Sequence, residues 1–93
     1  MHFVYILRCS DDSFYVGSTQ DVSQRLATHR AGESAVFTAR RLPVCLIYQE
    51  PFATLEEAVR REKQLKGWLR AKKAALVSGN LDLLSDLAAC RNP

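Results

Sequence analysis

The chain has no long apolar run. None of its apolar stretches approaches the ~20 residues that a membrane-spanning helix requires. Its first residues, MHFVYILRCSDD, lack the basic flank and the cleavage site of a signal peptide. We therefore expect a cytoplasmic protein that makes no membrane contact.

Cysteine pairs at metal-binding spacing are also missing. The three cysteines, Cys9, Cys45 and Cys90, are odd in number and none belongs to a CxxC motif. This pattern suggests neither a disulfide framework nor a structural zinc cluster. We expect each of the three to be a small, reduced core residue.

Several common catalytic motifs are absent as well. The sequence contains no glycine-rich phosphate loop, nucleophile elbow, HExxH motif or paired-carboxylate motif. Its composition, 47% hydrophobic and 25% charged, is that of an ordinary globular protein. A chain of 93 residues is long enough for one domain with one modest core. We predict a single domain over residues 1–93, with its core over about 2–78 and a C-terminal helix over about 80–90.

The net charge of +3 is small but unevenly distributed. The segment from Arg60 to Lys73 contains seven Lys or Arg residues and only one acidic residue, Glu62. A local basic excess of this kind suits a polyanion such as nucleic acid. On charge alone, an ordinary solvated helix face explains the run equally well.

Two short strands near the N-terminus form a hairpin. Phe3–Cys9 is rich in β-branched and aromatic residues, and Phe14–Gly17 is a second strand of the same character. Residues 10–13 between them have the composition of a turn.

The length of the hairpin loop decides where two tyrosines point. A three-residue loop that ends with Asp12 in the left-handed region pairs Tyr5 with Gly17 and places Tyr5 and Tyr15 on one face of the sheet. A loop of two or four residues places the tyrosines on opposite faces. The sequence does not exclude the second register. We predict the first, with a positive φ at Asp12 and with the hydroxyls of both tyrosines near Arg25, His29 and Glu62.

The rest of the chain is mainly helical. We expect a helix from Ser18 or Thr19 to about Arg30, closed by Gly32 in the left-handed region. Residues 35–40 form a loop or a short helical turn. The further elements are a strand over 44–48, a helix from the capping box at 54–57 to 66, a helix over 70–77 and the C-terminal helix. The order β-β-α-β-α-α-α predicts an α+β domain around a small, three-stranded, largely antiparallel sheet.

Glu62 is a carboxylate at an apolar position of its helix. The buried stripe of that helix is defined by Leu55, Ala58, Val59, Leu65 and Leu69. An ionised carboxylate in this stripe needs an arginine, a metal ion, or water at the edge of the domain. On the pattern alone, an ion pair with Arg25 or Lys66 is favoured over a metal ion.

Arg25 and His29 lie four residues apart on one helical face. Arginine holds a phosphate with a planar fork, and histidine exchanges a proton near neutral pH. Two solvated residues at a helix edge are the commoner explanation of such a pair. Tyr5, Tyr15 and Tyr48 stand on three different strands, where a tyrosine is usually a core residue with its hydroxyl at the rim.

These residues occur in an order that resembles the GIY-YIG nuclease superfamily. The order is Val4-Tyr5-Ile6, then Tyr15-Val16-Gly17, then Arg25 and His29, then Glu62. The phrases YILRC, YVGST and REKQLKGW look like the short bacterial single-domain branch of that superfamily. The resemblance covers about residues 2–78. The chain departs from the family where Val4 replaces the first glycine and Asp12 replaces a hairpin glycine.

The resemblance implies a three-stranded antiparallel sheet flanked by helices. It also implies a metal-dependent endonuclease that hydrolyses phosphodiester bonds, in DNA rather than RNA, with one Mg²⁺ or Mn²⁺ and a role in DNA repair or processing. Glu62 would bind the metal, and Tyr5 would deprotonate or orient the attacking water. Tyr15 would complete the polar site, Arg25 would stabilise charge on the phosphate, and His29 would be an auxiliary acid or base.

The substrate contacts implied by the resemblance lie beside this site. Gly17 would leave room for the substrate and backbone, and the basic helix would contribute Arg60, Arg61, Lys63 and Lys66. Larger relatives carry a second domain, so a protein partner that supplies specificity is implied here. One alternative is a non-catalytic nucleic-acid-binding module, in which the same basic helices hold phosphates. Another is a protein-interaction domain that uses the leucine-rich C-terminal helix.

Overall fold

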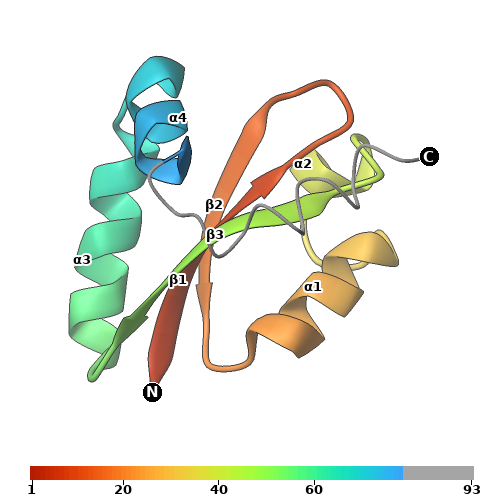
Figure 1. Ribbon diagram of the computed structural model, residues 1–93. Coiled ribbons are helices and arrows are strands. Elements are labelled where there is room, and N and C mark those ends of the chain that lie inside the picture. The colour runs from red at the N-terminus through yellow and green to blue at the C-terminus, as the bar shows by residue number, and fades with distance from the viewer. Residues whose placement is uncertain (79–93) are drawn as a thin grey trace.

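The fold is a three-stranded antiparallel sheet with helices on both faces (Figure 1). This computed structural model describes residues 1–78, so the C-terminal helix predicted over residues 80–90 lies outside the described part of the chain. The elements are β1 (His2–Arg8), β2 (Phe14–Thr19), α1 (Val22–Arg30), α2 (Val36–Ala39), β3 (Cys45–Phe52), α3 (Leu55–Lys66) and α4 (Arg70–Ser78). The predicted α+β class and strand arrangement are confirmed.

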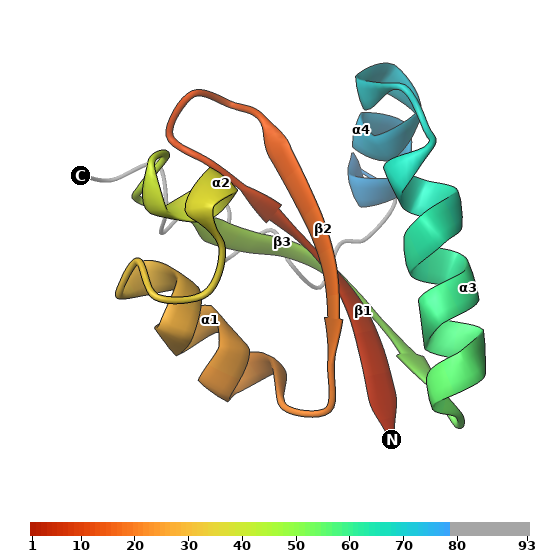
Figure 2. The same cartoon turned by 180° about the vertical axis from the view of Figure 1, so that it is seen from behind.

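The sheet has the strand order β2-β1-β3, so β1 is central and β2 is an edge strand. Helices α1 and α2 cover one face, and α3 and α4 cover the other, as both views show (Figures 1 and 2). Under α1, the core contains Tyr5, Leu7, Cys9, Val44 and Leu46. Under α3 and α4, it contains Val4, Ile6, Val16, Cys45, Ile47, Tyr48, Ala58, Leu65 and Val77. The domain therefore has two small cores with one sheet between them.

The hairpin has the three-residue loop. The Cys9 amide donates to the Ser13 carbonyl at 2.9 Å, and Asp12 has a φ of 66°. Tyr5 pairs with Gly17 across the two strands. Because side chains alternate along a strand, Tyr5 and Tyr15 share the face under α1. The predicted register and the left-handed Asp12 are confirmed.

Two element boundaries differ from the prediction. β2 continues to Thr19, so the cap of α1 is Asp21, whose carboxylate accepts the Gln24 amide at 3.0 Å. The start predicted at Ser18 or Thr19 is therefore wrong. β3 extends to Phe52 because Pro51 lies on an edge strand, where a missing amide hydrogen is tolerated. Gly32 has a φ of 76° just beyond α1, as predicted.

The cysteines only partly follow the prediction. Cys9 is a buried free thiol, as expected. Cys45 is buried too, but it is disulfide-bonded, so the prediction of a reduced thiol is wrong there. The prediction for Cys90 lies outside the described residues. Within residues 1–78, no helix has the length and apolar character needed to cross a bilayer.

Gly17 is required by its close approach to Tyr5. A Cβ atom on Gly17 would lie 2.5 Å from the Tyr5 hydroxyl oxygen and 2.6 Å from Cζ. Because the Tyr5 ring is buried and cannot move aside, Gly17→Ala should lower the free energy of unfolding by about 1–3 kcal/mol. Chemical denaturation measures this change.

Gly67→Ala is the matched control. Gly67 has a helical φ of −83°, and a Cβ there would meet its nearest atom at an ordinary 3.5 Å. Its effect should stay below about 1 kcal/mol. Equal effects of the two substitutions would contradict the steric role of Gly17.

Candidate active site

Tyr5 and His29 form the buried centre of the site. Their exposed fractions are 2% and 0%, and the Tyr5 hydroxyl lies 2.9 Å from His29 Nε2. The imidazole also packs edge-on against both tyrosine rings, with centroid distances of 5.8 Å to Tyr5 and 5.1 Å to Tyr15. The structure thus brings together three of the residues that the sequence singled out.

A third residue, Thr38 of α2, fixes the direction of the hydrogen bonds. Its hydroxyl lies 2.8 Å from His29 Nδ1 and donates to the Ala35 carbonyl at 3.1 Å. Since a carbonyl only accepts, the Thr38 oxygen must accept from Nδ1–H. Nε2 then carries the lone pair, and it accepts the hydroxyl hydrogen of Tyr5. The chain of donors runs from Tyr5 through His29 and Thr38 to the backbone.

Burial sets the protonation states of this pair. Burial raises the pKa of Tyr5 to about 12, with a contribution from the adjacent Tyr15 and an opposing one from Arg25. Burial lowers the pKa of His29, and the positive charge of Arg25 lowers it further. At neutral pH, Tyr5 is therefore a protonated donor and His29 is a neutral acceptor.

Arg25 is the cation of the site. It lies on the exposed side of α1 and forms no ion pair with any residue in 1–78. Its side chain borders two surface hollows, of about 420 and 410 Å³. The guanidinium group interacts with the Tyr5 hydroxyl, and its remaining N–H donors, next to open space, suit an anion such as a phosphate.

Glu62 of α3 approaches β2 from the other face of the sheet. Ser18 of β2 donates its hydroxyl to Glu62 Oε1 at 2.7 Å, and Lys66 Nζ lies 2.6 Å from Oε2. Burial acts to raise the pKa of Glu62, but the hydrogen bonds from Lys66 and Ser18 outweigh it, and the pKa is lowered. Glu62 is therefore ionised at neutral pH. Its partner is Lys66, one of the two alternatives, and not Arg25.

The site is divided by the edge strand β2. The side chain of Tyr15 points toward α1, and that of Ser18 points toward α3. Gly17 has no side chain to separate the two sides, and the charge of Glu62 still raises the pKa of Tyr5. The prediction of one group of side chains is thus modified: Tyr5 contacts His29 directly, and Glu62 acts from across the strand.

Glu62 fits a Mg²⁺ or Mn²⁺ ion only as a single protein ligand. Within residues 1–78, no cluster of three or more His, Cys, Asp or Glu residues could enclose a metal ion. Mg²⁺, however, keeps several water ligands and commonly takes one or two carboxylates together with substrate phosphates. One ionised carboxylate is compatible with that pattern.

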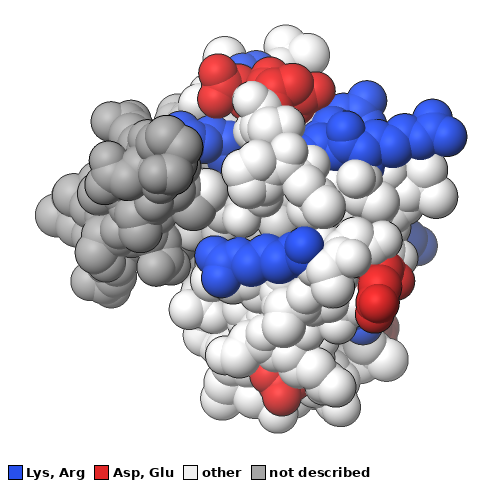
Figure 3. Space-filling model, turned by 90° about the vertical axis from the view of Figure 1, so that its right-hand side faces the viewer, with Lys and Arg blue, Asp and Glu red and all other residues white. Residues whose placement is uncertain are grey.

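The predicted basic contacts lie on different sides of α3. Lys66 reaches Glu62, and Arg60 and Lys63 are exposed on the outer side of the helix. On the other side of the molecule, over α1 and α2, basic and acidic side chains of the described residues are interspersed (Figure 3). A charge-based contact with nucleic acid is therefore expected on α3.

Arg61 does not belong to this contact surface. Its Nε atom lies 3.2 Å from a carboxylate oxygen of Glu50 on β3, and its guanidinium carbon lies 5.2 Å from the centre of the Trp68 ring. β3 is the edge strand opposite β2. The structure thus places Arg61 in an ion pair on the far side of α3, and not beside the tyrosines.

Sequence reasoning missed Ser18 and Thr38. Ser18 alternates with Gly17 along β2, so the confirmed register could have placed it toward α3. Thr38 lies in a short helix after an irregular loop, and no periodic pattern there points to His29. Its position depends on how the segment between α1 and α2 folds.

The pKa of His29 predicts how stability depends on pH. An unfolded histidine has a pKa near 6.5, whereas that of folded His29 is lowered, so protonation favours unfolding. The free energy of unfolding should have its full value above about pH 6.5 and should decrease as the pH drops below that value. Denaturation at about pH 7.5 and about pH 5.5 measures the fall, which should be smaller in His29→Gln. An equal fall in both proteins would contradict a buried, neutral His29.

Comparison with known proteins now identifies the family. The chain matches the GIY-YIG catalytic domain over residues 1–75. It is 46% identical to the UPF0213 protein SH2523 of Staphylococcus haemolyticus, over 82% of this chain and 93% of that one. The solution structure of the UPF0213 protein BH0048 from Bacillus halodurans is 44% identical, with a TM-score of 0.55 over 83% of this chain and 82% of that one. The protein EF2693 from E. faecalis is 36% identical, with a TM-score of 0.58 over 84% and 83%. The chain belongs to the GIY-YIG family, among its short bacterial UPF0213 proteins.

Proposed function

We propose that the chain is an endonuclease that hydrolyses phosphodiester bonds of nucleic acid, DNA rather than RNA, with one Mg²⁺ or Mn²⁺ ion. One observation carries the proposal: a buried tyrosine donates its hydroxyl to a neutral histidine beside an arginine without an ion-pair partner. Membership of a nuclease family supports it. A cytoplasmic location, a role in DNA repair or processing and a protein partner stay predictions.

Tyr5 and His29 provide a path for the proton of the attacking water. A tyrosine whose pKa is about 12 is a poor base unless its own proton leaves at the same time. His29 Nε2, 2.9 Å away, is the acceptor for that proton. As the water oxygen bonds to phosphorus, its proton passes to the Tyr5 oxygen and the Tyr5 proton passes to His29. The bond from phosphorus to the leaving oxygen breaks, and that oxygen takes a proton from solvent.

Arg25 and Glu62 supply the charges. The guanidinium group of Arg25 would hold two phosphate oxygens and stabilise the negative charge that grows on them. Glu62 would hold the divalent cation, which supplies further neutralisation of the phosphate. Ser18 fixes one carboxylate oxygen of Glu62 by its hydrogen bond.

The alternative is a non-catalytic nucleic-acid-binding module. One observation favours it: both oxygens of the Glu62 carboxylate already have partners, Ser18 and Lys66. A carboxylate in this state has a structural role without any metal ion. Cleavage assays separate the two functions.

The nuclease proposal predicts large losses from small changes in the site. Glu62→Gln keeps the size of the side chain but removes the charge that a hard cation requires, so metal-dependent cleavage should collapse. Tyr5→Phe keeps the packed ring and should slow cleavage about 10²-fold or more. Arg25→Lys keeps a charge without the fork and should have an intermediate effect. Single-turnover cleavage of labelled DNA and RNA, with Mg²⁺ or Mn²⁺, measures each loss.

Two matched substitutions control for general damage. Glu57→Gln changes an exposed glutamate of the same helix, and Tyr48→Phe removes a buried hydroxyl whose partner is Glu50. Both should cleave like the wild type. If Glu62→Gln and Tyr5→Phe also cleave like the wild type, the assigned mechanism is wrong. If the wild type cleaves no substrate but binds nucleic acid, the binding module is the better description.

Binding itself should weaken steeply with salt, because contacts of Lys and Arg with phosphates release counterions. Reversing the charge of both Arg60 and Lys63 should reduce the logarithmic salt slope by about 2. Arg40→Glu, at an exposed position beyond α2, should leave the slope unchanged. Fluorescence anisotropy at several salt concentrations gives the slopes. A slope near zero in the wild type would favour the protein-interaction domain.

A further inference from the structure

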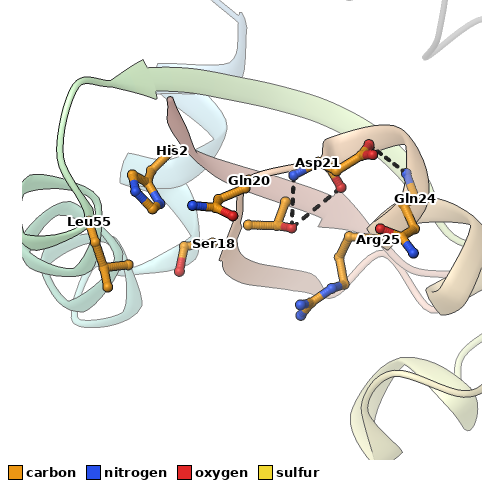
Figure 4. A pocket seen from close by; sticks show the side chains of 8 residues that line it. His2, Ser18, Gln20, Asp21, Gln24, Arg25 and Leu55 are labelled. Carbon is orange, nitrogen blue, oxygen red and sulfur yellow. Dashed lines mark hydrogen bonds between the residues drawn. The ribbon is translucent and has the colours of Figure 1, made fainter.

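The larger hollow beside Arg25 has no assigned role. It opens where the end of β2, the first turn of α1 and the first turn of α3 meet (Figure 4). Its volume of about 420 Å³ lies within the range of roughly 300–1,000 Å³ for small-molecule sites. Because Arg25 borders it, whatever occupies the hollow lies next to the phosphate that Arg25 would hold.

One end of the hollow is formed by a leucine and a histidine ring, with the hydroxyl of Ser18 beside them (Figure 4). Leu55 of α3 leaves 56% of its surface exposed, and the ring of His2 lies at the same end (Figure 4). The opposite end holds Arg25 and the start of α1. Flat rings stack well against such a surface, as bases do on the aromatic side chains of proteins that bind single strands. The hollow therefore suits a ligand with a flat apolar part near its phosphate.

Two glutamines also line the hollow, Gln20 in its middle and Gln24 at the same end as Arg25 (Figure 4). The side chains of Gln20 and Gln24 form no hydrogen bond with any residue in 1–78, although each carries a donor and an acceptor. Glutamine amides of this kind recognise the edges of nucleobases. Two amides without hydrogen-bond partners, in a hollow that also holds Leu55 and the flat ring of His2, match the mixed character of a base.

Asp21 excludes a phosphate from the hollow itself. Its carboxylate is fixed by the Gln24 amide at 3.0 Å and adds negative charge to the lining. A phosphate would be repelled there, whereas a neutral base with exocyclic amino groups would not. Arg25 also borders the second hollow, whose lining combines one carboxylate, Glu33, with the hydroxyls of Thr19, Thr28 and Ser34. A phosphate held by Arg25 would therefore lie at the rim that the two hollows share, and inside neither.

We propose that this hollow is a nucleobase subsite. It holds the base of the nucleotide next to the phosphate bound by Arg25, with Leu55 and His2 against its face and Gln20 and Gln24 at its edge. The inference rests on the proposed function, because it takes Arg25 as the phosphate ligand. It adds a base contact to a site that otherwise recognises only the backbone.

Oligonucleotides that lack a single base test the subsite. A set of oligonucleotides, each with one abasic position and together covering every position of the bound sequence, is bound to the protein carrying Glu62→Gln, so that no cleavage interferes. Removal of one particular base should weaken binding about tenfold. The double substitution Gln20→Ala and Leu55→Ala should weaken binding of the intact oligonucleotide by a similar factor. Combined, the two changes should cost no more than either alone, because they remove the same contact.

Gln49→Ala and Leu69→Ala form the matched control pair. Gln49 is exposed on β3, and Leu69 leaves 81% of its surface exposed between α3 and α4. Neither lines the hollow. With both substitutions, the abasic position should still weaken binding about tenfold, as in the unchanged protein.

The outcomes separate the subsite from the proposed function. If the wild type cleaves, but each abasic position weakens binding equally with and without the Gln20→Ala and Leu55→Ala substitutions, the subsite is wrong and the nuclease proposal stands. If the wild type neither binds nor cleaves the intact oligonucleotide, both are wrong. If it binds without cleaving, the abasic comparison still decides whether the hollow holds a base.

Discussion

The hydrogen bond between Tyr5 and His29 joins the central strand to the helix that covers it. It lies at the smaller core, and both side chains are buried. Its direction is fixed from outside by Thr38, which engages the other nitrogen of the imidazole. The packing of α2 therefore determines which nitrogen of His29 faces Tyr5 with a free lone pair. A polar pair buried in this way stabilises the fold only while every donor and acceptor has its partner.

Gly17 makes room for the Tyr5 side chain that forms this hydrogen bond. The Tyr5 ring occupies the space where any other residue would carry a Cβ atom, so the short edge strand and the central strand fit together at one point. Because Gly17 has no side chain, only the backbone of β2 separates the tyrosines from Glu62 at this position. One glycine thus serves both the packing of Tyr5 and the approach of the carboxylate.

Much of this arrangement followed from local sequence. The turn composition around Asp12 allowed the correct register, and with it the common face of Tyr5 and Tyr15. The apolar stripe of α3 identified Glu62 as a carboxylate that needs a partner. The resemblance to the GIY-YIG nucleases joined these residues into one site before any distance was known.

The remaining features depend on contacts between segments distant in sequence. The partnership of His29 with Thr38 requires the loop between α1 and α2 to return to the sheet. The second half of β3 was not predicted, because Pro51 disfavours a strand locally. On an edge strand the missing amide hydrogen of proline is tolerated. The ion pair of Arg61 with Glu50 was not predicted, because sequence cannot show which side of α3 faces β3. Each miss lies where tertiary contacts, and not local preference, decide the outcome.

The division of the site by β2 has an evolutionary consequence. The tyrosines and His29 belong to one core, whereas Glu62 is carried by a helix that packs on the other. Under the proposed mechanism, a descendant that loses Glu62 would lose the metal ligand without a change to any residue of either core. Such a descendant would be a binding protein and not a catalyst.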